Sequence, residues 1–295
     1  MKTLTFLLAL TCVGFTLSAA RGDVSVPTLL GFVNLPDRKC AVLKLVTPRV
    51  NYTRFSLLAE GQREGDIEVV RINPEKETVE LRVAGTNAVL TLGSESQPAS
   101  AGPLAIVLTN ASLQPVLTLY ADCAQRTLLR SPALPDGAFH IRAAPANRAE
   151  AAAVFENALA AQGIVSIPDG EKFLRIVPKA QAALARTRAM ESKFTVAEDS
   201  NVMPPGSINW TSADLWQVLP MYASLVGRKL DQAASARVEG SQIVFKNDTP
   251  LNRKELVYAM DVLLEWRGLK LVPEGADRIK LVSLSAEEIN RLRAR

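Results

Sequence analysis

The chain has 295 residues, which is long for one hydrophobic core and comfortable for two or three domains. Its net charge of +4 at pH 7 comes from dispersed basic residues, which indicate solvated surface rather than a nucleic-acid interface. The single histidine (His140) and two distant cysteines downstream of the N-terminus (Cys40, Cys123) cannot assemble the usual ligand set of a transition-metal site. We therefore expect no metal and no cofactor.

Residues 1–22 have the pattern of a signal peptide. Lys2 precedes an apolar run over residues 4–17, and the small residues Ser18, Ala19 and Ala20 offer a cleavage site. The run is shorter than the ~20 residues that a membrane span needs, so we expect cleavage and no span afterwards. The alternatives are an uncleaved anchor and a lipoprotein anchored through Cys12, which the poor lipobox before it disfavours.

Residues 24–93 predict a small all-β module. Alternating β-rich runs are separated by turn residues such as Glu60-Gly61 and Asn73-Pro74. The expected strands cover residues 40–46, 67–72, 78–83 and 88–92. Strands at this spacing favour an antiparallel sheet curled into a sandwich or half-barrel, and the Ser-, Pro- and Gly-rich residues 94–102 read as a linker.

The rest of the chain is an internal duplication. Residues 103–178 (repeat 1) recur as residues 205–284 (repeat 2), first at an offset of 102 and later at 105. Matched identities are Leu113/Leu215, Val116/Val218, Leu117/Leu219, Tyr120/Tyr222, Ala121/Ala223, Arg126/Arg228, Pro145/Pro250, Asn147/Asn252, Gly163/Gly268 and Gly170/Gly275. Tandem small modules usually form an extended binding or spacing device rather than a catalytic cleft.

Each repeat predicts a βαββαβ(β) order, so the fold class is α+β. In repeat 1, Ser112 and Asn147 are placed to cap two helices, and in repeat 2 the helices are expected over 213–226 and 252–267. Pro220 falls inside the first of these and should kink it. Residues 179–204 form a helical or extended linker, and residues 285–295 form a basic C-terminal helix that opens on a capping box.

Two resemblances cover most of the chain. Residues 213–219, 227–230 and 263–269 resemble the periplasmic N-terminal domains of secretins, the outer-membrane channels of type II secretion and type IV pilus systems. Leu30-Gly31-Phe32, residues 55–58 and 65–69 and Leu90-Thr91-Leu92 are similar to the homology region of inner-membrane secretion and pilus-assembly proteins. The resemblance implies KH-like repeats, a periplasmic location and action through protein contacts. Secretins continue into a long β-rich pore region, so a chain that stops at Arg295 is not expected to form a channel by itself.

These features predict a non-enzymatic scaffold or adaptor of a secretin-based machine. Its expected partners are a secretin or a pilus or secretion assembly protein, with self-association open. Trp216 and Trp266 lie off the apolar helix stripes and are the candidate partner-binding residues. The first strands of the two repeats, residues 105–109 and 207–210, are candidate sheet edges for strand addition. The alternative is an envelope module that recognises a glycan, a lipid or a small ligand.

Other chemistry lacks its sequence signature. Neither repeat has the Gly-x-x-Gly loop with which KH domains clamp nucleic acid. No Gly-x-Ser-x-Gly elbow appears, and the carboxylates Glu255, Asp261 and Glu265 read as solvated helix surface. We therefore expect no catalytic residue. Cys40 and Cys123 either form a disulfide that ties the N-terminal segment to repeat 1 or remain two buried thiols.

Overall fold

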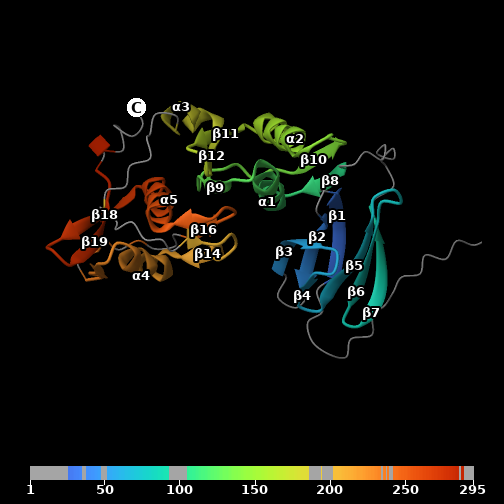
Figure 1. Cartoon of the computed structure of the whole chain (residues 1–295), viewed down its shortest axis with the longest axis horizontal. Helices are drawn as coiled ribbons and strands as arrows, with labels where there is room; N and C mark the ends of the chain where they lie inside the picture. Colours follow the sequence, from blue (N-terminus) through green and yellow to red (C-terminus); the bar gives the residue numbers. More distant parts are fainter. Residues whose placement is uncertain are drawn as a thin grey trace, which may run out of the picture.

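In the computed structural model the described residues are 26–34, 38–47, 52–92, 105–185, 194, 202–233, 235–236, 238, 242–285 and 287–288. The fold is α+β, as predicted, and its three parts follow one another along the long axis, from the N-terminal β-module through repeat 1 to repeat 2 (Figure 1). No helix in these ranges is long and apolar enough to cross a membrane. The predicted signal peptide lies outside the described residues.

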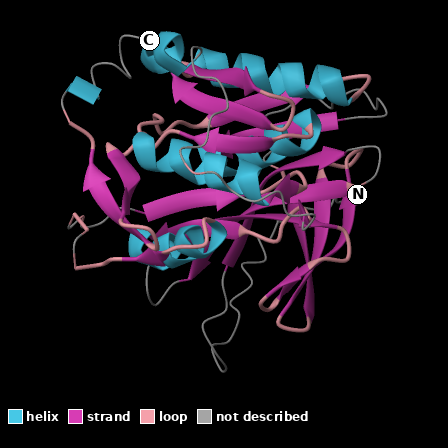
Figure 2. Ribbon diagram, turned by 60° about the vertical axis from the view of Figure 1, so that its left-hand side comes forward, coloured by secondary structure: helices cyan, strands magenta, loops and turns pink. Residues whose placement is uncertain are grey.

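The N-terminal module is a sandwich of two sheets. One face is built from β1 (Val26–Asn34), β2 (Lys39–Thr47) and β3 (Tyr52–Ala59), and the other from β4 (Arg63–Glu64), β5 (Ile67–Asn73), β6 (Thr78–Val83) and β7 (Thr86–Thr91). Alternate side chains point between the sheets, so Leu43 and Leu45 of β2 share one core with Val79 and Leu81 of β6. The second sheet carries no helix (Figure 2). The sandwich is as predicted, but β1 and β3 were not predicted as strands.

The first sheet continues without a break into repeat 1. Strand β1 pairs with β2 on one side and with β8 (Ala105–Ala111) on the other, and β8 pairs in turn with β10 (Phe139–Ala143). The strand order is β10-β8-β1-β2-β3. Gly31 allows this close approach, because a β-carbon there would lie 2.0 Å from the carbonyl oxygen of Val107. The expectation that residues 105–109 form a sheet edge is therefore wrong.

Repeat 1 continues with α1 (Leu113–Ala124), β9 (Thr127–Arg130), α2 (Arg148–Ala161), β11 (Ile164–Asp169) and β12 (Phe173–Pro178). Asn147 caps α2 by accepting a hydrogen bond from the Glu150 amide, as predicted. Ser112 holds the cap position of α1, but its hydroxyl makes no capping hydrogen bond, which corrects that prediction. The short helices η2 (Lys179–Gln181) and α3 (Ala182–Ala185) are the described part of the predicted linker helix.

Repeat 2 contains two helices against short strands. Its elements are β13 (Val202–Met203), β14 (Asn209–Asp214), α4 (Leu215–Leu225), β15 (Lys229–Leu230), β16 (Gln242–Lys246), β17 (Leu251–Asn252), α5 (Arg253–Glu265), β18 (Leu269–Glu274) and β19 (Arg278–Ser283). Helix α4 begins two residues later than predicted, because Asp214 forms a capping box with Gln217. Pro220 lies inside α4 on an exposed position, and nothing in the structure explains it. Of the predicted C-terminal helix, only residues 287–288 are described as helical.

The two repeats share their strand register residue by residue. Ile164 pairs with Pro178 and Leu269 with Ser283, so the closing hairpins match at the offset of 105. The first strands carry a bulge at the same place, shown by the pairs Leu108–Ile141 and Ala111–Phe139 in repeat 1 and Trp210–Phe245 and Ala213–Ile243 in repeat 2. The duplication read from the sequence is thus a duplication of backbone structure.

Candidate interaction site

Each repeat contains a buried tyrosine, at the same position, that donates a hydrogen bond to a carboxylate of its own repeat. Tyr120 donates to Glu156 over 2.6 Å, and Tyr222 donates to Asp261 over 2.7 Å. Burial, reinforced by the adjacent carboxylate, raises the pKa of both tyrosines. Asp261 is itself buried, so its interpretation as solvated helix surface is wrong. The signal was present in the repeat alignment, where Glu156 and Asp261 are both acidic at the offset of 105.

The repeats are joined by hydrogen bonds between Tyr258 of repeat 2 and a buried ion pair of repeat 1. In repeat 1, Arg175 Nε donates to Asp169 Oδ2 over 2.6 Å, and the side chains of both residues are at most 6% exposed. The hydroxyl of Tyr258, on α5 of repeat 2, donates to the same oxygen over 2.5 Å and accepts from Arg175. Burial opposes the charge of Arg175, but its hydrogen bonds and charge interactions with Asp169 and Tyr258 together outweigh burial and raise its pKa. Burial and the bond to Asp169 raise the pKa of Tyr258 to about 12.

Further contacts surround this ionic group and make a wide junction. Thr127 on β9 accepts hydrogen bonds from the Asp248 and Thr249 amides, each over 3.1 Å. Lys172 binds Glu255 over 2.8 Å, and Phe173 packs on the ring of Tyr258 with centroids 5.7 Å apart. Since every one of these contacts crosses from repeat 1 to repeat 2, the two repeats form one body.

The matching face of repeat 2 is partly exposed instead of buried. Glu274 and Lys280 occupy the positions of Asp169 and Arg175 and form an ion pair over 2.8 Å, but their side chains are 32% and 33% exposed. Arg278 and Lys229 stand where Phe173 and Thr127 stand in repeat 1. A polar outer face is typical of the terminal unit of a repeat array, so repeat 2 has the surface of a capping repeat.

The two candidate tryptophans lie in different environments. Trp216 is partly buried against the core of repeat 2. Trp266 packs both on that core and on Ile167 and Val177 of repeat 1, so part of its burial comes from the junction. The structure does not bring the two tryptophans together around a concavity.

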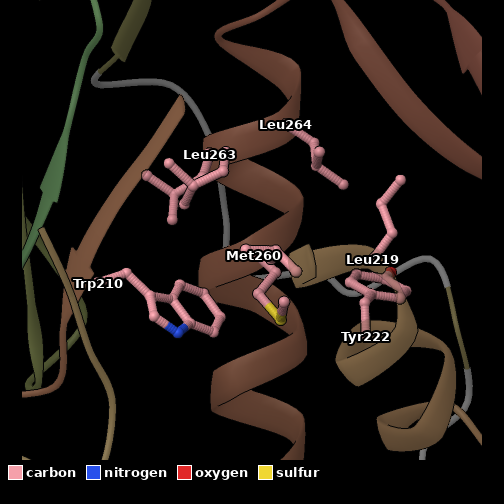
Figure 3. Close-up of a pocket in the computed structure, with 8 residues that line it drawn as sticks. Trp210, Leu219, Tyr222, Met260, Leu263 and Leu264 are labelled. Atoms are coloured by element: carbon pink, nitrogen blue, oxygen red, sulfur yellow. The ribbon is translucent and has the colours of Figure 1, made fainter. Parts of the chain in front are cut away.

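The tryptophan that does line a hollow is Trp210, which sequence reasoning did not single out. The hollow lies between β14, β16, α4 and α5, and Met260 projects between Trp210 and the Leu219–Tyr222 side (Figure 3). All eight residues that line it are apolar or aromatic: Trp210, Val218, Leu219, Tyr222, Ile243, Met260, Leu263 and Leu264. The hollow is small, with a volume of about 10 Å³, and the one hydroxyl of its lining residues, that of Tyr222, is bonded to Asp261.

Cys40 and Cys123 both lie on the side of the five-stranded sheet that faces the core of repeat 1. Cys40 lies opposite Val33 in the register of β1 and β2, on the side of the sheet that joins the core of repeat 1. Cys123, near the end of α1, belongs to that core, and both residues are buried. Arg38 forms an ion pair with Asp122, which brings the end of α1 to the start of β2. Both alternatives, a disulfide and two buried thiols, therefore remain predictions.

The interpretation of Glu255 as solvated helix surface is also wrong, because its side chain is only 13% exposed. Glu255 completes the capping box of α5 and also binds Lys172. His140 is exposed on β10, as its alternation predicted. Within the described ranges, no group of three or more His, Cys, Asp or Glu residues could hold a metal ion.

No protein-family model matches the chain, and no curated protein matches it.

Proposed function

We propose that this chain is a non-enzymatic periplasmic scaffold or adaptor of a secretin-based secretion or pilus machine. The observation that carries the proposal is the pairing of β1 with β8, with Phe32 opposite Val107. The N-terminal module resembles the homology region that, in the secretin systems, binds secretin N-terminal domains. In this chain it adds its strand to the first repeat that resembles such a domain.

Two further features support a scaffold. The shared sheet and the buried junction of Asp169, Arg175 and Tyr258 fix three modules in one elongated body, which suits a spacer or adaptor. The polar side chains described above form hydrogen bonds with neighbouring groups of the chain, at the helix caps and in the junction between the repeats.

The test is affinity purification of the C-terminally tagged chain from crosslinked native envelopes, with mass spectrometry of the proteins that accompany it. An exported protein of similar size with the same tag is the control. We expect a secretin or a pilus or secretion assembly protein to be enriched over the control. Recovery of a glycan, lipid or small molecule with no machine component would overturn the proposal and favour the ligand-binding alternative.

A further inference from the structure

The first strand of repeat 1 is paired along both of its edges. Strand β8 has β10 on one side and β1 on the other, and Val107 of β8 lies opposite Phe32 of β1. The N-terminal module also contributes apolar side chains to the core of repeat 1, namely Leu30, Val33 and Val42. It therefore supplies both a backbone partner and part of the hydrophobic packing.

In repeat 2 the matching edge has no strand beside it among the described residues, where β14 pairs with β16 alone. The backbone of Ile208 faces the β16 side, since its N–H donates to Asn247 Oδ1 over 2.8 Å and its carbonyl accepts from the Asn247 N–H over 3.2 Å. Backbone directions alternate along a strand, so the N–H and carbonyl of Asn209 point away from β16. Asn209 matches Val107, which lies opposite β1 in repeat 1.

The bulge of β14 after Trp210 limits strand addition at this edge to the residues before the bulge, which carry no charge or proline. Residues 207–210 include no charged residue and no proline, and Asn209 is exposed. Its neighbour Trp210 lines the apolar hollow (Figure 3). In repeat 1, the residues that match the hollow's Trp210, Val218 and Leu219 are Leu108, Val116 and Leu117, and they share one core with the apolar side chains of the N-terminal module.

We propose that the outer edge of β14 binds an extended segment of a partner protein by antiparallel strand addition centred on Asn209, with an apolar side chain of that segment packing on the face of the sheet that carries Trp210. The occupant has the chemistry of β1: an uncharged strand with a small residue where Gly31 stands and an apolar residue where Val33 stands. A second copy of the chain is a poor source, because its β1 is already paired with its own β8. The inference deepens the proposed scaffold function and rests on it for its biological meaning.

The probe is a labelled synthetic peptide with the sequence of Val26–Asn34, titrated into the purified full chain and followed by fluorescence anisotropy up to about 1 mM. Asn209→Pro removes the N–H that points away from β16. Because this N–H makes no hydrogen bond to β16, an edge strand can accept proline at this position. Asn209→Ala is the matched control, because it removes the side chain and keeps the N–H. A second peptide is N-methylated at the phenylalanine that corresponds to Phe32, which removes the donor from the probe and leaves the protein unchanged.

We expect the peptide to bind, Asn209→Ala to change its affinity by less than about twofold, and both Asn209→Pro and the N-methylated peptide to weaken it by about tenfold or more. Equal binding by Asn209→Pro and the parent chain, or no binding by the parent, would overturn the proposal. A dimer of the chain that Asn209→Pro dissociates would assign the edge to a second copy and would also overturn it. Because these measurements use only the purified chain and two synthetic peptides, their failure leaves the envelope purification result standing, and the reverse also holds.

Discussion

Replacing Asp169 by alanine should destabilise the fold far more than removing the matched acid of repeat 2. The Asp169 carboxylate accepts hydrogen bonds from Arg175 over 2.6 Å and from Tyr258 over 2.5 Å, at a place where its side chain is only 6% exposed. Without it, the Arg175 guanidinium stays buried with its charge uncompensated. Breaking a buried pair in this way costs about 3–5 kcal/mol.

Glu274→Ala is the matched control. Glu274 pairs with Lys280 over 2.8 Å at the same place in repeat 2, but there both side chains are about one-third exposed. Pairs of this kind contribute about 0–1 kcal/mol, because water and salt screen them. The two substitutions therefore differ by about 2–5 kcal/mol in the free energy of unfolding although they remove the same interaction from the same position of a repeat.

The assay is urea unfolding of the parent chain and the two variants, with the free energy of unfolding taken from the midpoint and slope. We also expect Asp169→Ala to lower the slope if the weakened junction lets the repeats unfold separately. Equal losses of stability in the two variants would refute the reasoning, since they would mean that repeat 2 does not bury the Asp169–Arg175 pair.

Three further predictions concern the tyrosine, glycine and cysteine positions. Because the pKa of Tyr258 is raised from 10.0 to about 12, its contribution is fully present below pH 10 and is lost as the pH rises to about 12, so Tyr258→Phe should show a shallower alkaline loss of stability by urea unfolding. Gly31→Ala should lower the free energy of unfolding by about 3 kcal/mol or more, because its β-carbon would meet a backbone carbonyl of β8 at 2.0 Å. Gly137→Ala is the control and should cost much less, since its β-carbon would meet only a flexible side-chain end at 3.0 Å. Thermal unfolding compares the two variants, and equal melting temperatures would contradict the close approach of β1 and β8. If Cys40 and Cys123 pair on export, the intact mass should be lower by two hydrogen atoms and reduction should cost about 2–4 kcal/mol, whereas an unchanged mass after reduction would show two thiols.

The sequence predicts elements whose pattern is local. The strand over residues 78–83 has the predicted bounds, because its alternation reflects one buried and one exposed face. The prediction that Asn147 caps α2 is also confirmed. This signal is local, because the amide that donates to Asn147 belongs to Glu150, three residues further along the chain. By contrast, β14 extends into the predicted start of a helix because its pairing with β16 reaches Asp214, and pairing with a distant strand leaves no local pattern.

The interaction surfaces depend on contacts that sequence patterns cannot locate. Nothing in the apolar run around Gly31 shows that β1 pairs across a linker with β8. Asp169 and Arg175 were not recognised, although their matched residues Glu274 and Lys280 repeat the charges at the offset of 105. The repeated charges could have indicated that an ion pair forms in each repeat. Which of the two ion pairs is buried depends on the packing of Tyr258, which the sequence does not show.

The most direct test of a single rigid array is native-state hydrogen exchange at its two joints. We expect the amides of Phe32 and Val107 in the shared sheet, and the Thr249 amide that donates to Thr127 at the junction, to exchange only through global unfolding. Their protection should then equal that of the core of repeat 1. Exchange at these amides at the rate of an open loop, while the cores of the separate modules stay protected, would show that the modules move independently and would contradict the scaffold proposed here.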